Sequence, residues 1–145
     1  MNDQKQITGF LQSVPLFSGV SVKKLEQLAA RMVERDYAAG QHIVTQGMGG
    51  EGFFILIGGK AEAYRERTGN SKLLVNTFVP TNFFGELALL DDGPRTASVV
   101  AAEPTKCLVL TRWDFLGVLR DGDAEMAVTI LQEMAKRFRL ALDAM

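Results

Sequence analysis

The residues most able to bind a ligand lie between positions 83 and 100. Two aromatic side chains precede Gly85, a short run of helix-forming residues begins at Glu86, and an Asp-Asp-Gly-Pro turn ends it. A short helix that follows a glycine presents unpaired backbone N–H groups at its start, where an anion is favoured. Arg95 comes directly after the turn and supplies a permanent cation, while the Glu86 carboxylate either complements the helix dipole or accepts hydrogen bonds from hydroxyl groups. This combination suits a ligand with one phosphate charge and a sugar hydroxyl.

Within this stretch the chain reads Gly85-Glu86-Leu87-Ala88-Leu89 and, after a spacer, Pro94-Arg95-Thr96-Ala97. The pattern resembles the phosphate-binding cassette of cyclic-nucleotide-binding domains. The resemblance extends from about Val14 to the C-terminal helix and includes Tyr37-Ala38-Ala39-Gly40-Gln41-His42-Ile43. It implies a β-roll that binds cAMP, has no catalytic activity, and signals by repositioning its C-terminal helix. A cGMP-selective sensor is the alternative assignment of the ligand.

The resemblance also implies a role for each cassette residue. Arg95 would pair with the cyclic phosphate, and the Glu86 carboxylate would accept the ribose 2′-hydroxyl. Gly85 would let the backbone pass close to the sugar. Two further sets of residues would complete the site: backbone N–H donors around Leu87, Ala88 and Ala97, and a lining formed by Val75, Phe83 and Leu87.

The choice of base is less sharply marked by the sequence. In the family, a threonine at the position of Thr96 is often associated with cGMP, although bacterial cAMP binders also carry threonine or serine there. In the catabolite activator a Thr-Ser pair on the long helix addresses adenine, whereas the corresponding place here is Ala141-Leu142. Arg137 and Arg139 are candidates to stack on the purine, and Leu142 is a candidate lid residue. We expect cAMP on the prevalence of that ligand.

Composition and charge describe an ordinary globular chain. The sequence has 145 residues, of which 47% are hydrophobic and 23% charged, so it can form one domain with a genuine core. Its net charge of −1 gives no electrostatic reason to expect nucleic acid or a membrane surface as a partner. No apolar run approaches the roughly 20 residues that span a bilayer, and the polar N-terminus lacks a signal-peptide pattern. The single cysteine excludes an internal disulfide and is typical of a cytoplasmic protein.

Apolar spacing divides the chain into helical ends and a β-rich middle. Residues 1–32 are expected to form N-terminal helices, 33–111 a β-roll that contains the cassette of residues 83–100, and 112–145 C-terminal helices. We expect a single domain of the α+β class, mainly β, with an antiparallel, jelly-roll-like β-roll and a short cassette helix. The expected strands are Val33–Ala38, His42–Gln46, Gly52–Ile57, Lys60–Arg67, Leu73–Val79, Thr96–Ala101 and Lys106–Leu110.

The last segment, from about Asp123, has apolar residues at alternating spacings of four and three, which is the pattern of a helical seam. Such a helix can simply lie on the β-roll. It can also close over a ligand, pair with a second copy of the chain, or do both, and a homodimer through this helix is therefore one expected partner. The effector that receives the signal is unknown. The seam consists of Ala127, Leu131, Met134, Phe138, Ala141 and Met145.

Other functional classes find little support in the residues. His42 and Cys107 are the only histidine and cysteine, so a soft-ligand metal site is not expected, and Cys107 lies in a core-strand pattern where a thiol is inert. The run Gly47–Gly52 matches a dinucleotide fingerprint in letters, but a strand pattern rather than a helix follows it. The basic cluster Lys136, Arg137 and Arg139 has no helix-turn-helix after it. Two rival classes remain. One is a cupin-like metalloenzyme, which needs a cluster of histidine and carboxylate ligands that a single histidine does not supply. The other is a β-roll that serves only as an interaction or dimerisation domain.

Overall fold

The computed structural model describes residues 3–49, 52–69, 71–85, 93–121 and 124–144. The chain divides into two compact units, one of Met1–Arg31 with Trp113–Met145, and one of Met32–Arg112. The first unit is helical and the second is built from strands. The expected cassette helix, with Glu86, Leu87 and Ala88, lies outside the described residues. The expectation that the whole chain is a single domain stays a prediction.

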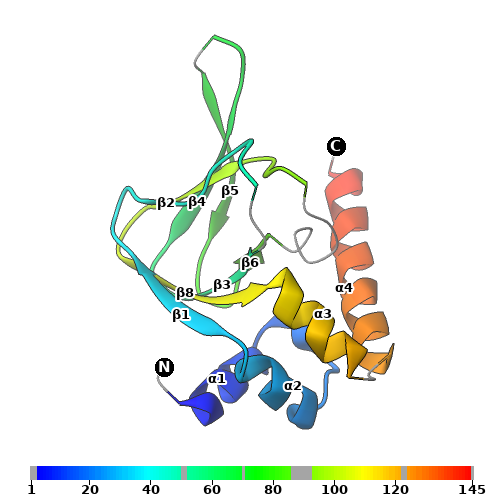
Figure 1. Cartoon of the computed structure of the whole chain (residues 1–145). Coiled ribbons are helices and arrows are strands. Elements are labelled where there is room, and N and C mark those ends of the chain that lie inside the picture. Colours follow the sequence, from blue (N-terminus) through cyan, green and yellow to red (C-terminus); the bar gives the residue numbers. More distant parts are fainter. Residues whose placement is uncertain (1–2, 50–51, 70, 86–92, 122–123, 145) are drawn as a thin grey trace. The chain divides into compact units, whose positions relative to one another are not determined.

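The strand unit forms two antiparallel sheets of four strands each (Figure 1). The order of strands is β1-β8-β3-β6 in the first sheet and β2-β7-β4-β5 in the second. This arrangement confirms the expected antiparallel β-roll. The strands are β1 (Val33–Tyr37), β2 (His42–Val44), β3 (Gly52–Gly58), β4 (Ala61–Glu66), β5 (Lys72–Phe78), β6 (Phe83–Phe84), β7 (Ser98–Ala101) and β8 (Thr105–Thr111).

The interior of the roll follows from the two-residue period of its strands. Both sheets direct apolar side chains into one buried cluster. The central strand β3 is buried on both faces, so its sequence is a continuous apolar run instead of an alternation. The cluster therefore ties the two sheets together without any polar side chain. Its members are Phe54, Leu56, Ala61, Ala63, Phe78, Phe84, Val99, Cys107 and Val109.

The β4–β5 hairpin extends beyond the other strands of the roll (Figure 1). Its register changes along its length, because Ala63 pairs with Asn76 whereas Tyr64 pairs with Leu74. Val75 is therefore an extra residue in β5, a β-bulge that locally breaks the alternation of side chains. The bulge allows two consecutive residues of β5, Val75 and Asn76, to face the same side.

The turn that leads into β6 contains a strained residue. Thr81 has φ of 75°, a left-handed conformation that a β-branched side chain rarely adopts. The Asn82 N–H donates to the Val79 carbonyl at 2.9 Å, which closes a turn with Pro80 and Thr81 at its centre. The side-chain oxygen of Asn82 accepts from the Val79 N–H at 2.9 Å and reinforces the turn. A left-handed residue at this place of such a turn is normally glycine.

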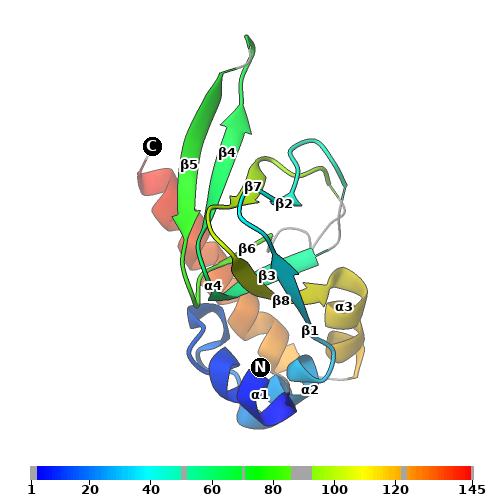
Figure 2. The same cartoon turned by 90° about the vertical axis from the view of Figure 1, so that its left-hand side faces the viewer.

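The helical unit begins with α1 (Gln4–Leu11), a 3-10 turn η1 (Pro15–Phe17) and α2 (Val22–Ala29). The side chain of Asp3 caps α1 by accepting from the Gln6 N–H at 2.8 Å, and Ser21 caps α2 by accepting from the Lys24 N–H at 3.3 Å. The helices α1 and α2 lie side by side and contact each other (Figure 2).

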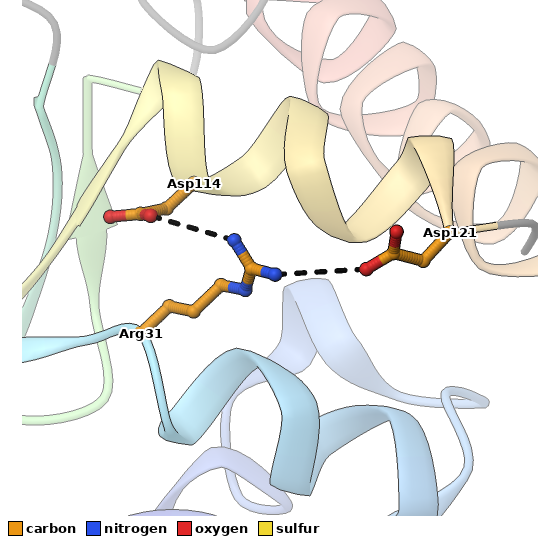
Figure 3. Close-up of polar contacts among 3 residues, drawn as sticks. All are labelled: Arg31, Asp114 and Asp121. Carbon is orange, nitrogen blue, oxygen red and sulfur yellow. Dashed lines mark ion pairs between the residues drawn. The ribbon is translucent and has the colours of Figure 1, made fainter.

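The C-terminal part of this unit consists of α3 (Arg112–Arg120) and α4 (Ala124–Asp143). Arg31, just after α2, reaches one carboxylate on α3 and one directly after it, with its Nη1 at 3.7 Å from Asp114 and its Nη2 at 3.6 Å from Asp121 (Figure 3). Gly117 lies between these carboxylates, and a Cβ there would be 2.9 Å from Nη1 of Arg31. The absence of a side chain at Gly117 thus lets the guanidinium cross the surface of α3. All three charged groups are partly exposed, so the ion pairs add little stability.

The helix α4 has large apolar side chains on its surface. Leu131 and Phe138 of the expected seam are 49% and 64% exposed, and Leu142 is 52% exposed. Trp113, at the start of α3, is 59% exposed. Within the described residues, no helix combines the length and the apolar character needed to cross a bilayer.

Candidate functional site

A cavity of about 450 Å³ opens into the strand unit. This volume lies within the range of pockets that hold small organic ligands. Its wall is mostly apolar, with a few polar side chains, which is the usual composition of such pockets. The lining consists of Val44, Ala63, Arg65, Val75, Asn76, Phe78, Phe84, Gly85, Gly93, Pro94, Arg95, Thr96, Ala97 and Val99.

Arg95 is the most strongly constrained polar group of the cavity. Its backbone N–H donates to the Met48 carbonyl at 3.0 Å, and its own carbonyl accepts from the Gly47 N–H at 2.9 Å. Its Nη2 donates to the Gly52 carbonyl at 2.8 Å, and the guanidinium lies 5.9 Å from the centre of the Phe54 ring. Gly47 and Met48, between β2 and β3, therefore hold the backbone of Arg95, and Gly52 at the start of β3 holds its guanidinium.

The guanidinium of Arg95 is not fully satisfied. Its Nε is buried and has no hydrogen-bond partner. Among the described residues no carboxylate forms an ion pair with Arg95, and burial lowers the pKa of the guanidinium. A buried donor without a partner costs free energy, so it needs an explanation. An anion in the cavity would supply the missing acceptor and charge.

Gly85 makes room for this arginine. It has φ of 83°, and a Cβ at this position would lie 2.8 Å from Nη1 of Arg95 and 2.8 Å from the Gly52 carbonyl oxygen. Both the conformation and the space therefore require glycine. The sequence pattern marks Gly85 as a site residue and gives its role as letting the backbone pass close to the sugar. The structure adds that Gly85 seats the guanidinium.

Most of the expected binding residues that the structure describes line this one cavity. Gly85, Arg95, Thr96, Ala97 and Val75 are all part of its wall. Thr96 is exposed and Ala97 is half-buried, just before β7.

Phe83 does not line the cavity, contrary to its expected position. Its ring packs against Phe53 at 5.5 Å between centroids, whereas Phe84 stacks on Phe54 at 5.0 Å and is part of the cavity wall. Successive residues of a strand point to opposite faces, so only one of the two phenylalanines can face the interior. The spacing of the motif does not say which one does.

The other expected residues lie elsewhere. Glu86, Leu87 and Ala88 are outside the described residues. Arg137, Arg139 and Leu142 are exposed on α4, in the helical unit, and their role at the base or as a lid stays a prediction.

Two polar residues of the lining were not identified from the sequence. Arg65 on β4 and Asn76 on β5 both face the cavity. Arg65 follows Ala61 and Ala63 at the two-residue period, so the alternation already contained the signal for its orientation. Asn76 could not be placed from sequence, because the bulge at Val75 is invisible there.

Among the described residues, those that could support other chemistry do not gather at a site. His42 is exposed and its Nδ1 lies 3.3 Å from the Thr45 hydroxyl. Cys107 is fully buried in the roll, which confirms its expected place in a core strand, and burial raises the pKa of its thiol to about 12. In the part of the chain that the structure describes, no three His, Cys, Asp or Glu residues are grouped to hold a metal ion.

A family model described as "Cyclic nucleotide-binding domain" matches residues 34–121. The chain belongs to the cyclic nucleotide-binding domain family. The matched segment contains the whole lining of the cavity, from Val44 to Val99. The resemblance in the cassette residues is thereby confirmed at the level of the family.

A curated relative of this cyclic nucleotide-binding domain is the cyclic AMP receptor protein of Thermus thermophilus. It is 33% identical over 110 residues, which are 76% of this chain and 51% of the relative. The chain thus spans about half the length of that relative.

Solved structures with the same fold come from regulatory proteins. The N-terminal domain of a transcriptional regulator from Streptomyces coelicolor A3(2) has a TM-score of 0.81 and 30% identity, over 93% of this chain and 94% of that one. The regulatory domain of Toxoplasma gondii PKA, in a co-crystal with cAMP, has a TM-score of 0.79 and 25% identity, over 92% of this chain and 50% of that one. These two structures are described as parts of a transcriptional regulator and of a kinase regulatory domain.

Proposed function

We propose that the cavity binds a 3′,5′-cyclic purine nucleotide and that this domain acts as a sensor without chemistry of its own. The observation that carries the proposal is Arg95, a cavity arginine with a buried, unbonded Nε and no carboxylate partner among the described residues. A cyclic phosphate carries one negative charge and would be the missing partner of this guanidinium. By resemblance, Glu86 would accept the ribose 2′-hydroxyl and N–H groups around Leu87, Ala88 and Ala97 would assist Arg95.

The first candidate ligand is cAMP. Support comes from the names of two relatives, a cyclic AMP receptor protein and a PKA regulatory domain crystallised with cAMP. The alternative is cGMP, which the hydroxyl of Thr96 on the cavity wall would favour through a contact to guanine. The apolar wall would receive the purine in either case.

We further propose that the nucleotide acts by shifting the population of positions of α4. A ligand can move this helix only as far as its affinities for two arrangements differ. The exposed seam residues Leu131 and Phe138 make α4 the surface expected to pair with a second copy of the chain or to meet an effector. The effector and the expected cytoplasmic location stay predictions.

Titration calorimetry with cAMP, cGMP, 5′-AMP and 5′-GMP tests the proposed ligand class. We expect both cyclic nucleotides to bind and both 5′-monophosphates to bind much more weakly, because the open phosphate carries more charge and lacks the fixed ring geometry. The proposal is overturned if none of the four ligands binds. Equal affinity for cyclic and open forms would also contradict it, since the cavity would then hold any nucleotide phosphate.

The rival class, a β-roll that serves only for interaction, predicts a different result. Such a domain would show no thermal shift with any cyclic nucleotide. The unsatisfied Arg95 argues against it, because a cavity without a ligand gains nothing from a buried, unbonded donor.

A further inference from the structure

The cavity contains a second arginine that the proposed contacts do not use. Arg65 lines the cavity from β4, and its backbone is fixed because the Glu66 N–H donates to Oε1 of Gln46 at 2.7 Å. Arg65 lies on the same face of β4 as Ala63, which pairs with Val99 across the roll's second sheet. Among the described residues it has no ion pair and no side-chain hydrogen bond, and the described lining contains no acidic residue. The cavity therefore presents two cations to a ligand class that has one phosphate charge.

Asn76 adds to the same wall a group that can donate. Its Oδ1 accepts a hydrogen bond from the backbone N–H of Thr77 at 2.8 Å. Because an N–H can donate only to the oxygen end of the amide, this contact fixes which end is which. The amide nitrogen, with both of its N–H groups, is left for a ligand. Arg65 has donors only, so the β4–β5 wall offers a surplus of hydrogen-bond donors.

Guanine and adenine differ in the hydrogen-bonding groups that they present to donors on this wall. Guanine carries acceptors at both O6 and N7, and an arginine can bind the two together. Adenine has the N7 acceptor but carries a donor amino group at C6, which opposes the donors of the wall. The donors of Arg65 and Asn76 therefore match a purine with a carbonyl at C6.

We propose that Arg65, supported by Asn76, is a specificity-determining residue that selects cyclic nucleotides with a carbonyl at purine C6. This inference rests on the proposed cyclic-nucleotide site and refines it. If Arg65 has this role, the preferred ligand is cGMP and not cAMP, the ligand that the names of the relatives support. Arg95 holds the phosphate in both cases, so the selection arises at the base alone.

Three nucleotides separate this role from a general effect of charge. cGMP and cIMP both carry the C6 carbonyl, whereas cAMP carries the amino group. We expect wild-type protein to bind cGMP and cIMP about tenfold more tightly than cAMP, the discrimination that one bidentate contact gives. In Arg65→Met the advantage of cGMP and cIMP should disappear, while the affinity for cAMP should change by less than about threefold.

Arg67→Met is the matched control, because Arg67 belongs to the same hairpin but is absent from the cavity wall. It should leave all three affinities as in wild type. A thermal denaturation curve checks that Arg65→Met is folded, as expected for an exposed side chain.

Each other outcome has a definite meaning. An equal loss for all three nucleotides in Arg65→Met would make Arg65 a second phosphate contact and would overturn the role at the base. An unchanged cGMP-to-cAMP ratio would overturn it as well, while leaving the proposed function intact. If wild-type protein binds none of the three, the proposed function fails and the inference fails with it.

Discussion

At the scale of single residues, the strand unit holds one buried cation, Arg95, with a hydrogen-bond donor left unpaired. Arg95 is fixed by three hydrogen bonds, two to Gly47 and Met48 and one to Gly52 at the start of β3, yet its Nε lacks a partner. Gly85 is required because any side chain there would collide with the same guanidinium. Thus two residues that are ten positions apart form one unit, in which glycine provides the space and arginine the charge.

The first prediction concerns this charge. Arg95→Ala should weaken the binding of a cyclic nucleotide by on the order of 2–5 kcal/mol, because it leaves the desolvated phosphate unpaired. Calorimetry on the variant measures the loss, and Arg67→Ala, which removes the same charge outside the cavity wall, should bind as wild type. An unchanged affinity in Arg95→Ala would remove this residue from the site.

A second prediction follows from Cys107. Burial raises the pKa of its thiol to about 12, whereas an unfolded thiol has a pKa of about 8.5. As the pH rises, the unfolded chain therefore loses the thiol proton before the folded chain does. The contribution of the protonated thiol to the free energy of unfolding is complete below about pH 8.5 and is lost as the pH rises toward 12. The slope is about 1.4 kcal/mol per pH unit.

Urea denaturation across this alkaline window measures the slope. Cys107→Ala should lose less stability with rising pH than wild type, by about that amount per unit. Both proteins are compared in a Tyr37→Phe background, because the pKa of Tyr37 is raised by burial and also by Cys107, so its titration would otherwise differ between them. Parallel slopes would mean that the thiol ionises as readily in the folded protein as in the unfolded chain.

At the scale of elements, the turn before β6 departs from what its backbone demands. Thr81 in this turn has φ of 75°. At such a φ a glycine is relaxed and a threonine is strained. The strain lies within four residues of Gly85, at the entrance to the cassette.

We therefore expect Thr81→Gly to raise the free energy of unfolding by up to about 1 kcal/mol. The relief of about 1–2 kcal/mol of left-handed strain exceeds the entropic cost of about 0.5–1 kcal/mol of a glycine in the unfolded chain. Thr77→Gly, within β5, is the control and should destabilise the protein. Denaturation by urea reports both, and a destabilised Thr81→Gly would show that the threonine side chain makes a compensating contact.

The sequence predicted elements well and orientations less well. The strand periods between Val33 and Leu110 led to the right fold, because these signals are local. It did not predict that Phe84 rather than Phe83 faces the cavity, since a two-residue strand has no alternation of its own to read. The bulge at Val75 depends on pairing with β4, which is a tertiary property.

At the scale of the whole molecule, α4 is the expected route from ligand to response. Amide hydrogen exchange in α4 should become slower on addition of a cyclic nucleotide and not of a 5′-monophosphate. Exchange in α2 serves as the internal reference and should not change. Identical exchange in α4 with and without nucleotide would mean that the helix does not respond.

The seam on α4 gives a prediction about assembly. Phe138 lies on the seam and is 64% exposed, whereas Leu140 is 63% exposed and lies two residues off it. If the seam pairs two copies, Phe138→Glu should yield monomers in sedimentation velocity and Leu140→Glu should remain dimeric. Wild-type protein that sediments as a monomer at every concentration would contradict the pairing.

The tryptophan at the start of α3 offers a way to follow these events without a label. Trp113 is the only tryptophan of the chain and its side chain is 59% exposed, so its intrinsic fluorescence comes from one water-accessible indole. Its emission spectrum and its quenching by iodide then report on the surroundings of a single helix. A blue shift on ligand addition would mean that this indole has left water, and the same cuvette would give both affinity and kinetics.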